Sequence, residues 1–132
     1  MVIVDTTVWI DFFKGRETDQ VGKLEKLVSE ETDVFTTGLI VQEVLSGIKR
    51  KRERETVRKE FDHFIVVMPT FDTHIQAAEI FDVCQKKGYT IRSVIDCLIA
   101  ALALEYDLTI LENDRDYGYI SAVVPLKTFR AN

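Results

Sequence analysis

The sequence predicts an α/β fold: a three-layer α/β/α domain whose central, mainly parallel sheet has four to five strands. Short β-branched apolar runs alternate along the chain with longer segments whose apolar residues recur at helical spacing. Parallel strands need a crossover between them, usually a helix, so this alternation favours parallel pairing with helices on both faces. The length of 132 residues fits one domain, which we expect to span residues 1–132.

The first strand and the first two helices are predicted from short-range patterns. Residues 2–4 form an apolar β-branched run, and Asp5 or Thr6 can begin the helix that follows and ends at Gly15. A second helix is expected over residues 18–30, because its apolar residues recur three or four positions apart.

The next strand is expected over residues 34–37. Residues 38–51 place their apolar side chains over a broad arc of a helical wheel, and the charged stretch after them is expected to continue this helix to Glu60. Residues 64–67 form a third apolar run, and Pro69 ends it because proline has no N–H for a strand ladder.

The second half of the chain contains the most apolar helix. A helix over residues 71–87 is followed by Gly88, a residue typical of helix C-termini. Ser93 begins a nearly all-apolar helix over residues 94–106, which must be buried because most of its circumference is aliphatic. The remaining predicted elements are short: a strand over 108–111, a loop over 112–114, a turn or helix near Tyr117 and an extended segment over 123–126.

Composition excludes several classes of protein. The net charge of −5 argues against a protein that coats nucleic acid through a general positive field. No apolar run reaches the roughly eighteen residues of a membrane span, and the N-terminus lacks the pattern of a secretory signal, so we expect a cytoplasmic protein that does not bind membranes. Cys84 and Cys97 lie in predicted helices without zinc-site spacing, and we expect reduced core thiols.

Three carboxylates are expected at the edge where the parallel strands end. Asp5 and Asp114 follow two separate strands, and Asp96 lies in the first turn of a helix that begins at this edge. Each has an ordinary alternative role: helix capping for Asp5, a capping box with Ser93 for Asp96, and a turn for Asp114. Glu43 lies within an apolar helical arc, so it should point inward and has no such local role.

Clustered carboxylates imply a cation. Two carboxylates about 4 Å apart repel by roughly 4 kcal/mol at an effective dielectric of about 20, and no basic residue in these segments is an evident partner. Oxygen ligands without histidine or cysteine favour Mg²⁺ or Mn²⁺ over zinc. The sequence therefore predicts a divalent-metal site built from these acids.

Four motifs together carry a resemblance to a known family. They are Val-Asp5-Thr-Thr7, the lone Glu43 in Val-Gln-Glu-Val, Ser93-Val-Ile-Asp96 before an Ala/Leu-rich helix, and Asn113-Asp114-Arg-Asp116-Tyr117. In this order the set resembles a PIN-domain nuclease, most closely the VapC-type toxins of type II toxin–antitoxin modules. The resemblance covers nearly the whole chain, from Val2 through Tyr117.

The resemblance implies roles for individual residues. Asp5, Glu43, Asp96 and Asp114 match the acidic quartet of the family, all four as candidate metal ligands, with Glu43 alternatively orienting the attacking water. The supporting residues are Thr7, which matches a hydroxyl position, Asp116, which matches an auxiliary acid, and Glu112, which stands where many relatives have threonine and is either a supporting residue or an extra metal ligand.

The resemblance also implies activity and partners. It implies an endoribonuclease that requires Mg²⁺ or Mn²⁺, forms a homodimer and is inhibited by a VapB-type antitoxin that inserts a segment near the acidic site. Within the one basic stretch of the chain, Lys49, Arg50 and Arg52 become candidate contacts to the RNA backbone, whereas the alternative is a solvated helical face.

Other functions stay open at this point. A PIN-domain nuclease that processes RNA outside a toxin–antitoxin module has the same motifs. A phosphatase of the Asp-x-Asp type would need an acid in place of Thr7, and a phospho-accepting receiver would need an aspartate at the end of the 64–67 strand. A non-catalytic binding module would keep the pocket for structure alone. The aromatic residues Trp9, Phe12 and Phe13 fit either the core or an interface with a partner.

Overall fold

One parallel sheet of five strands forms the centre of the protein in the computed structural model, which describes residues 1–130. Residues 131 and 132 of the predicted domain lie outside the described residues. The strands are β1 (Val2–Val4), β2 (Val34–Thr36), β3 (Ile65–Val66), β4 (Thr109–Glu112) and β5 (Lys127–Arg130). The helices are α1 (Thr6–Phe13), α2 (Asp19–Ser29), α3 (Gly38–Ser46), α4 (Lys51–Glu60), α5 (Phe71–Lys86), α6 (Val94–Glu105) and α7 (Arg115–Ser121), with a 3₁₀ turn η1 (Phe61–His63). The predicted α/β class with a parallel sheet is confirmed.

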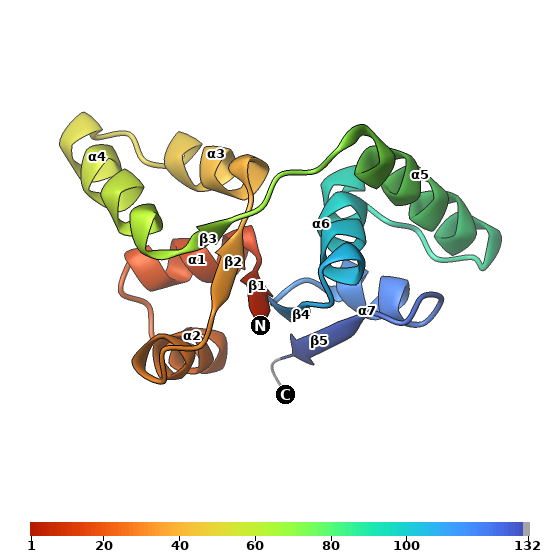
Figure 1. Cartoon of the computed structure of the whole chain (residues 1–132), viewed down its shortest axis with the longest axis horizontal. Coiled ribbons are helices and arrows are strands. Elements are labelled where there is room, and N and C mark those ends of the chain that lie inside the picture. The colour runs from red at the N-terminus through yellow and green to blue at the C-terminus, as the bar shows by residue number, and fades with distance from the viewer. Residues whose placement is uncertain (131–132) are drawn as a thin grey trace.

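The order of the strands is β3-β2-β1-β4-β5, and every pair is parallel. Helices α1 to α4 gather on one side of the sheet and α5 to α7 on the other, giving three layers (Figure 1). From β1 the chain moves outward through β2 to β3 and then returns to the other side of β1 as β4. The strand order therefore reverses between β1 and β4, which is where open α/β sheets bind ligands beyond the strand ends.

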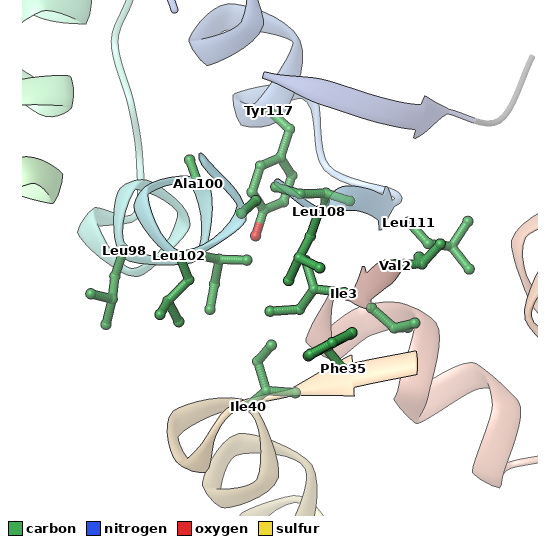
Figure 2. Close-up of a cluster of buried hydrophobic side chains, with 14 of the residues drawn as sticks. Val2, Ile3, Phe35, Ile40, Leu98, Ala100, Leu102, Leu108, Leu111 and Tyr117 are labelled. Carbon is green, nitrogen blue, oxygen red and sulfur yellow. The ribbon is translucent and has the colours of Figure 1, made fainter. Parts of the chain in front are cut away.

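The core lies on both sides of the central strands. Side chains from β1, β2, α3, α6 and α7 converge in it, and Figure 2 shows Leu102 of α6, Ile3 of β1 and the ring of Tyr117 in one cluster. Helix α6 is buried along nearly its whole length, as the aliphatic sequence predicts. This packing holds the first turn of α6 against the ends of β1 and β4.

The predicted helix from residue 38 to Glu60 is wrong in one respect, because it is broken in two. Helix α3 ends before Gly47, and α4 begins only at Lys51. Glycine is a poor helix former, and the four consecutive cations from Lys49 to Arg52 would repel one another near a helix N-terminus. The basic stretch consequently begins in a loop and continues into the first turn of α4.

Two strands at the C-terminal end differ from the prediction in their bounds. Strand β4 begins one residue later than expected and includes Glu112, which the sequence analysis places in a loop. The extended segment predicted over 123–126 is wrong: the N–H groups of Val123 and Val124 bond to Ile120 after α7, and Pro125 has no N–H. Strand β5 therefore begins at Lys127.

The structure decides between the core and an interface for Trp9, and it confirms the buried positions predicted for the two cysteines. Trp9 is fully buried and packs against the rings of Phe12, Phe13, Phe61 and Phe64, so it belongs to the core. Cys84 and Cys97 are buried free thiols, and burial raises the pKa of Cys97 to about 12. Among the described residues, no helix combines the length and apolarity needed to cross a membrane.

Candidate active site

The predicted acids converge at the carboxyl ends of β1 and β4, the two strands between which the sheet order reverses. Asp5 directly follows β1, and the neighbouring strand β4 leads through Glu112 to Asp114, which caps α7. Asp96 lies in the first turn of α6. The prediction that strand ends and helix N-termini bring these acids to one edge is therefore confirmed in the geometry.

Three carboxylates form the tightest group. One oxygen each from Asp96, Asp114 and Asp116 lies within 4.8 Å of the others. Asp96 and Asp116 are 7% and 1% exposed, and Asp96 Oδ2 receives no hydrogen bond from any described residue. An oxygen-only donor set with a buried, unsatisfied acceptor fits a hard divalent cation, which would both neutralise the charges and satisfy that oxygen.

Asp96 is the carboxyl group most perturbed by this arrangement. Burial, followed by the charges of Asp5, Asp114 and Asp116, raises its pKa from 3.8 to about 8. In the metal-free protein at neutral pH, Asp96 therefore holds a proton, which lowers the repulsion within the group. A divalent cation would take the place of that proton.

Asp5 is held by two hydroxyl groups. Tyr117 donates to its Oδ1 at 2.8 Å, and Thr7 donates to its Oδ2 at 3.4 Å. Burial raises the pKa of Asp5, the charges of Asp114 and Glu43 add to the increase, and the bond from Tyr117 opposes it. Asp5 occupies the N-cap position of α1, but its side chain makes no capping hydrogen bond. The alternative role of Asp5 as a helix cap is therefore wrong.

Glu43 stands apart from the three-carboxylate group. Its carboxylate accepts a 2.8 Å bond from the hydroxyl of Thr6, and the residue is half-buried. Its charge contributes to the raised pKa of Asp5, so the two acids face the same region. Helix α3 thus presents Glu43 to the site from the opposite side of the sheet to α6.

A chain of hydrogen bonds fixes the loop between β4 and α7. The Asp114 N–H donates to Glu112 Oε2 at 2.8 Å, and the Asp116 N–H donates to Asp114 Oδ1 at 2.9 Å. Glu112 is fully buried, and its backbone carbonyl accepts from the side chain of Gln20. Glu112 therefore supports the loop that carries Asp114 and Asp116. Asp114 also serves as the N-cap of α7, so its alternative role in a turn is real and coexists with its place in the site.

One basic residue joins the acids, although the sequence indicates no evident partner for them. Arg92 precedes α6, and its guanidinium lies 3.5 Å from Asp114 Oδ1 and 3.8 Å from Asp116 Oδ1. Its backbone N–H donates to Asp116 Oδ2 at 3.0 Å. The alternative role of Asp96 in a capping box with Ser93 is not realised, because the Ser93 side chain makes no capping bond. The loop before α6 is held instead through Asp116.

Sequence reasoning missed the site roles of Arg92, Tyr117 and Thr6. A basic residue just before a helix that carries an acid, and an aromatic hydroxyl directly after Asp116, were the available signals. Neither specifies its partner, because Tyr117 and Asp5 are separated by 112 positions in the chain. The RNA-contact candidates Lys49, Arg50 and Arg52 are exposed around the loop between α3 and α4.

The PIN-domain family model matches residues 2–123 of the chain. The chain belongs to the PIN-domain family. This PIN domain is 28% identical over 130 residues to ribonuclease VapC11 of Mycobacterium tuberculosis, a match that covers 96% of each chain.

Solved structures share the fold of this PIN domain. The structure of VapBC2 from Rickettsia felis, bound to a promoter DNA fragment, matches with a TM-score of 0.78 at 14% identity, covering 100% of both chains. A toxin–antitoxin complex from Klebsiella pneumoniae matches with a TM-score of 0.73 at 18% identity, covering 96% of this chain and 99% of that one.

Proposed function

We propose that this PIN domain is an Mg²⁺- or Mn²⁺-dependent endoribonuclease and the toxin of a type II toxin–antitoxin pair. The observation that carries the proposal is the convergence of Asp5, Asp96, Asp114 and Asp116 at the point where the strand order reverses. Two of these acids, Asp96 and Asp116, are buried and each has a carboxylate oxygen without a hydrogen bond from a described residue. The similarity to ribonuclease VapC11 supports RNA as the substrate.

We assign metal binding, orientation of the attacking water and support of the loop to different residues of the site. Asp96, Asp114 and Asp116 would hold the cation, and Asp5, fixed by Tyr117 and Thr7, lies beside them as a further ligand. A bound divalent cation supplies positive charge that activates water and neutralises the phosphate. Glu43, held by Thr6, would orient the attacking water and accept its proton. Glu112 keeps the Asp114 loop in place.

The test is RNA cleavage by the purified chain freed of any partner. Cleavage should require Mg²⁺ or Mn²⁺ and stop on addition of a chelator. Saturating Mn²⁺ should also raise the melting temperature by roughly 5 to 10 °C, because a ligand that binds only the folded state stabilises it. Cleavage that persists in chelator would overturn the proposal, and labelling by acetyl phosphate in place of cleavage would favour the phospho-acceptor alternative.

A VapB-type antitoxin is the proposed partner, supported by the fold shared with the toxin–antitoxin complex from Klebsiella pneumoniae. Co-expression with such an antitoxin should suppress cleavage and allow a stable complex to be isolated. A nuclease that processes RNA outside a toxin–antitoxin module would retain its activity in that experiment.

A homodimer is also proposed, supported by an apolar groove of about 430 Å³ between α3, α5 and α6. The groove is lined by residues of mostly apolar type, which a second copy would bury: Leu39, His74, Ala77, Ala78, Phe81, Val94, Ile95 and Leu98. Ala78→Glu places a charge at an exposed groove position and should shift the protein from dimer to monomer in sedimentation. Gln76→Glu adds the same charge on the opposite, exposed face of α5 and should leave the dimer intact. A dimer that survives Ala78→Glu would exclude this groove.

The basic loop is proposed to contact the RNA backbone. Replacing Lys49 and Arg50 by alanine removes two exposed charges and should weaken RNA binding while flattening its salt dependence by a slope of about 1 to 2. The readout is the RNA dissociation constant at a series of salt concentrations. A control variant with alanine at the exposed Lys26 and Lys87 should keep the original slope, whereas an unchanged slope in the first variant would reject the contact.

A further inference from the structure

Arg92 occupies an unusual place for a surface arginine. Its side chain is 58% exposed, yet its guanidinium is directed at the Asp114 and Asp116 carboxylates of the three-carboxylate group. Of the ion pairs found in residues 1–130, these two are the ones that involve the acids of the site. The protein thus brings its own cation to the edge of the proposed metal site.

The backbone of Arg92 is fixed while its side chain is not. The Arg92 N–H donates to Asp116 Oδ2 at 3.0 Å, and the preceding residue, Ile91, is buried in the core. The guanidinium contacts, at 3.5 and 3.8 Å, are longer than charge-assisted hydrogen bonds, which are typically about 2.7 to 2.9 Å. Arg92 therefore has an anchored backbone and a long, solvated side chain that can change partners at low cost.

A bound divalent cation would weaken the attraction that holds the Arg92 guanidinium at the Asp114 and Asp116 carboxylates. A cation with a charge of about +2 would take the place of the Asp96 proton, so the net negative charge that faces the guanidinium falls by about one unit and its attraction for Arg92 weakens. An RNA phosphate at the metal supplies a new negative group within the same region. The guanidinium matches phosphate oxygens with two parallel N–H donors, a geometry that an ammonium group lacks.

We propose that Arg92 is the exchangeable counter-ion of the active site: it pairs with Asp114 and Asp116 when no metal is bound and turns to the scissile phosphate when metal and RNA bind. This inference rests on the proposed function, because it requires both a metal and an RNA phosphate at the site. It gives Arg92 two opposite effects, competition with the metal and assistance to cleavage.

Metal affinity tests the first effect without relying on activity. Titration calorimetry with Mn²⁺ should show about three- to tenfold tighter binding for Arg92→Gln than for the natural sequence, since a competing charge is gone. Arg115→Gln is the matched control: Arg115 is exposed and adjacent to Asp114, and its side chain makes no ion pair or hydrogen bond with the described residues. Its change in Mn²⁺ affinity should be smaller. Unchanged or weaker Mn²⁺ binding by Arg92→Gln would overturn the proposal.

Cleavage at saturating Mn²⁺ tests the second effect. Arg92→Gln should lower kcat/KM by roughly 10- to 100-fold despite its fuller metal site, because a phosphate-binding donor is lost. Arg92→Lys keeps the charge, so its Mn²⁺ affinity should stay close to that of the natural protein while cleavage still falls. Full activity of Arg92→Gln would also overturn the proposal. If the natural protein neither binds Mn²⁺ nor cleaves RNA, the proposed function fails; if it does both and Arg92→Gln behaves identically, only the inference about Arg92 fails.

Discussion

Replacing Asp96 by asparagine is expected to lower RNA cleavage by at least about a thousandfold while the protein remains folded. Asp96 lies 7% exposed between Asp5, Asp114 and Asp116, and asparagine has nearly the same shape but carries no charge for a cation. The stabilisation by Mn²⁺ should disappear with the activity. The measurements are initial cleavage rates and melting temperatures with and without Mn²⁺.

The same substitution should make the metal-free protein more stable. The pKa of Asp96 rises from 3.8 in the unfolded chain to about 8 in the folded protein, so between these values the folded state binds the extra proton. The free energy of unfolding of the natural protein should therefore fall as the pH rises from about 4 to about 8. Asp96→Asn should remove that decrease and gain on the order of 4 kcal/mol at pH 7.

A control separates this effect from a general change in charge. Asp33 is exposed, and Asp33→Asn removes the same charge away from the three-carboxylate group, so it should change neither cleavage nor the pH profile. Denaturant unfolding at a series of pH values, without metal, gives the comparison. An Asp96→Asn protein that still cleaves RNA, or that becomes less stable at pH 7, would remove Asp96 from its proposed role.

Asp116 and Glu43 are expected to differ sharply in metal binding. Asp116→Asn should weaken Mn²⁺ binding by at least about tenfold, because Asp116 supplies one of the three oxygens that lie within 4.8 Å. Asparagine retains an oxygen that can accept the Arg92 N–H, so the loop should persist. Glu43→Gln should change Mn²⁺ affinity by less than about threefold while still lowering cleavage, because Glu43 lies outside that group and is held by Thr6.

Calorimetry separates the two roles, because a ligand loses Mn²⁺ affinity, whereas a residue that orients water loses cleavage with its Mn²⁺ affinity nearly unchanged. If Glu43→Gln loses Mn²⁺ as strongly as Asp116→Asn, Glu43 is also a metal ligand and its proposed role in orienting water is wrong. Circular dichroism of both variants should match that of the natural protein, which would exclude unfolding as the cause.

The alternation of strands and helices could be predicted because it depends on short-range patterns. The β-branched run of β1, the aliphatic helix α6 and the terminating Gly88, whose φ is +86°, each report a local conformation. The errors arose where propensity and charge compete. The break before α4 follows from glycine and a run of cations, and the late start of β5 follows from Pro125, which a simple count of apolar residues does not weigh.

The sequence by itself determined the fold class and the edge at which Asp5, Asp96 and Asp114 meet, because the carboxyl ends of parallel strands point the same way whatever the details of packing. Only the tertiary structure decided which side chains touch. It places Asp116 in the three-carboxylate group and makes Glu112 a hydrogen-bond acceptor that supports the Asp114 loop. It also pairs Asp5 with the Tyr117 hydroxyl and Asp114 with Arg92. These contacts join distant parts of the chain, and their free energies depend on burial and distance, which no local pattern encodes.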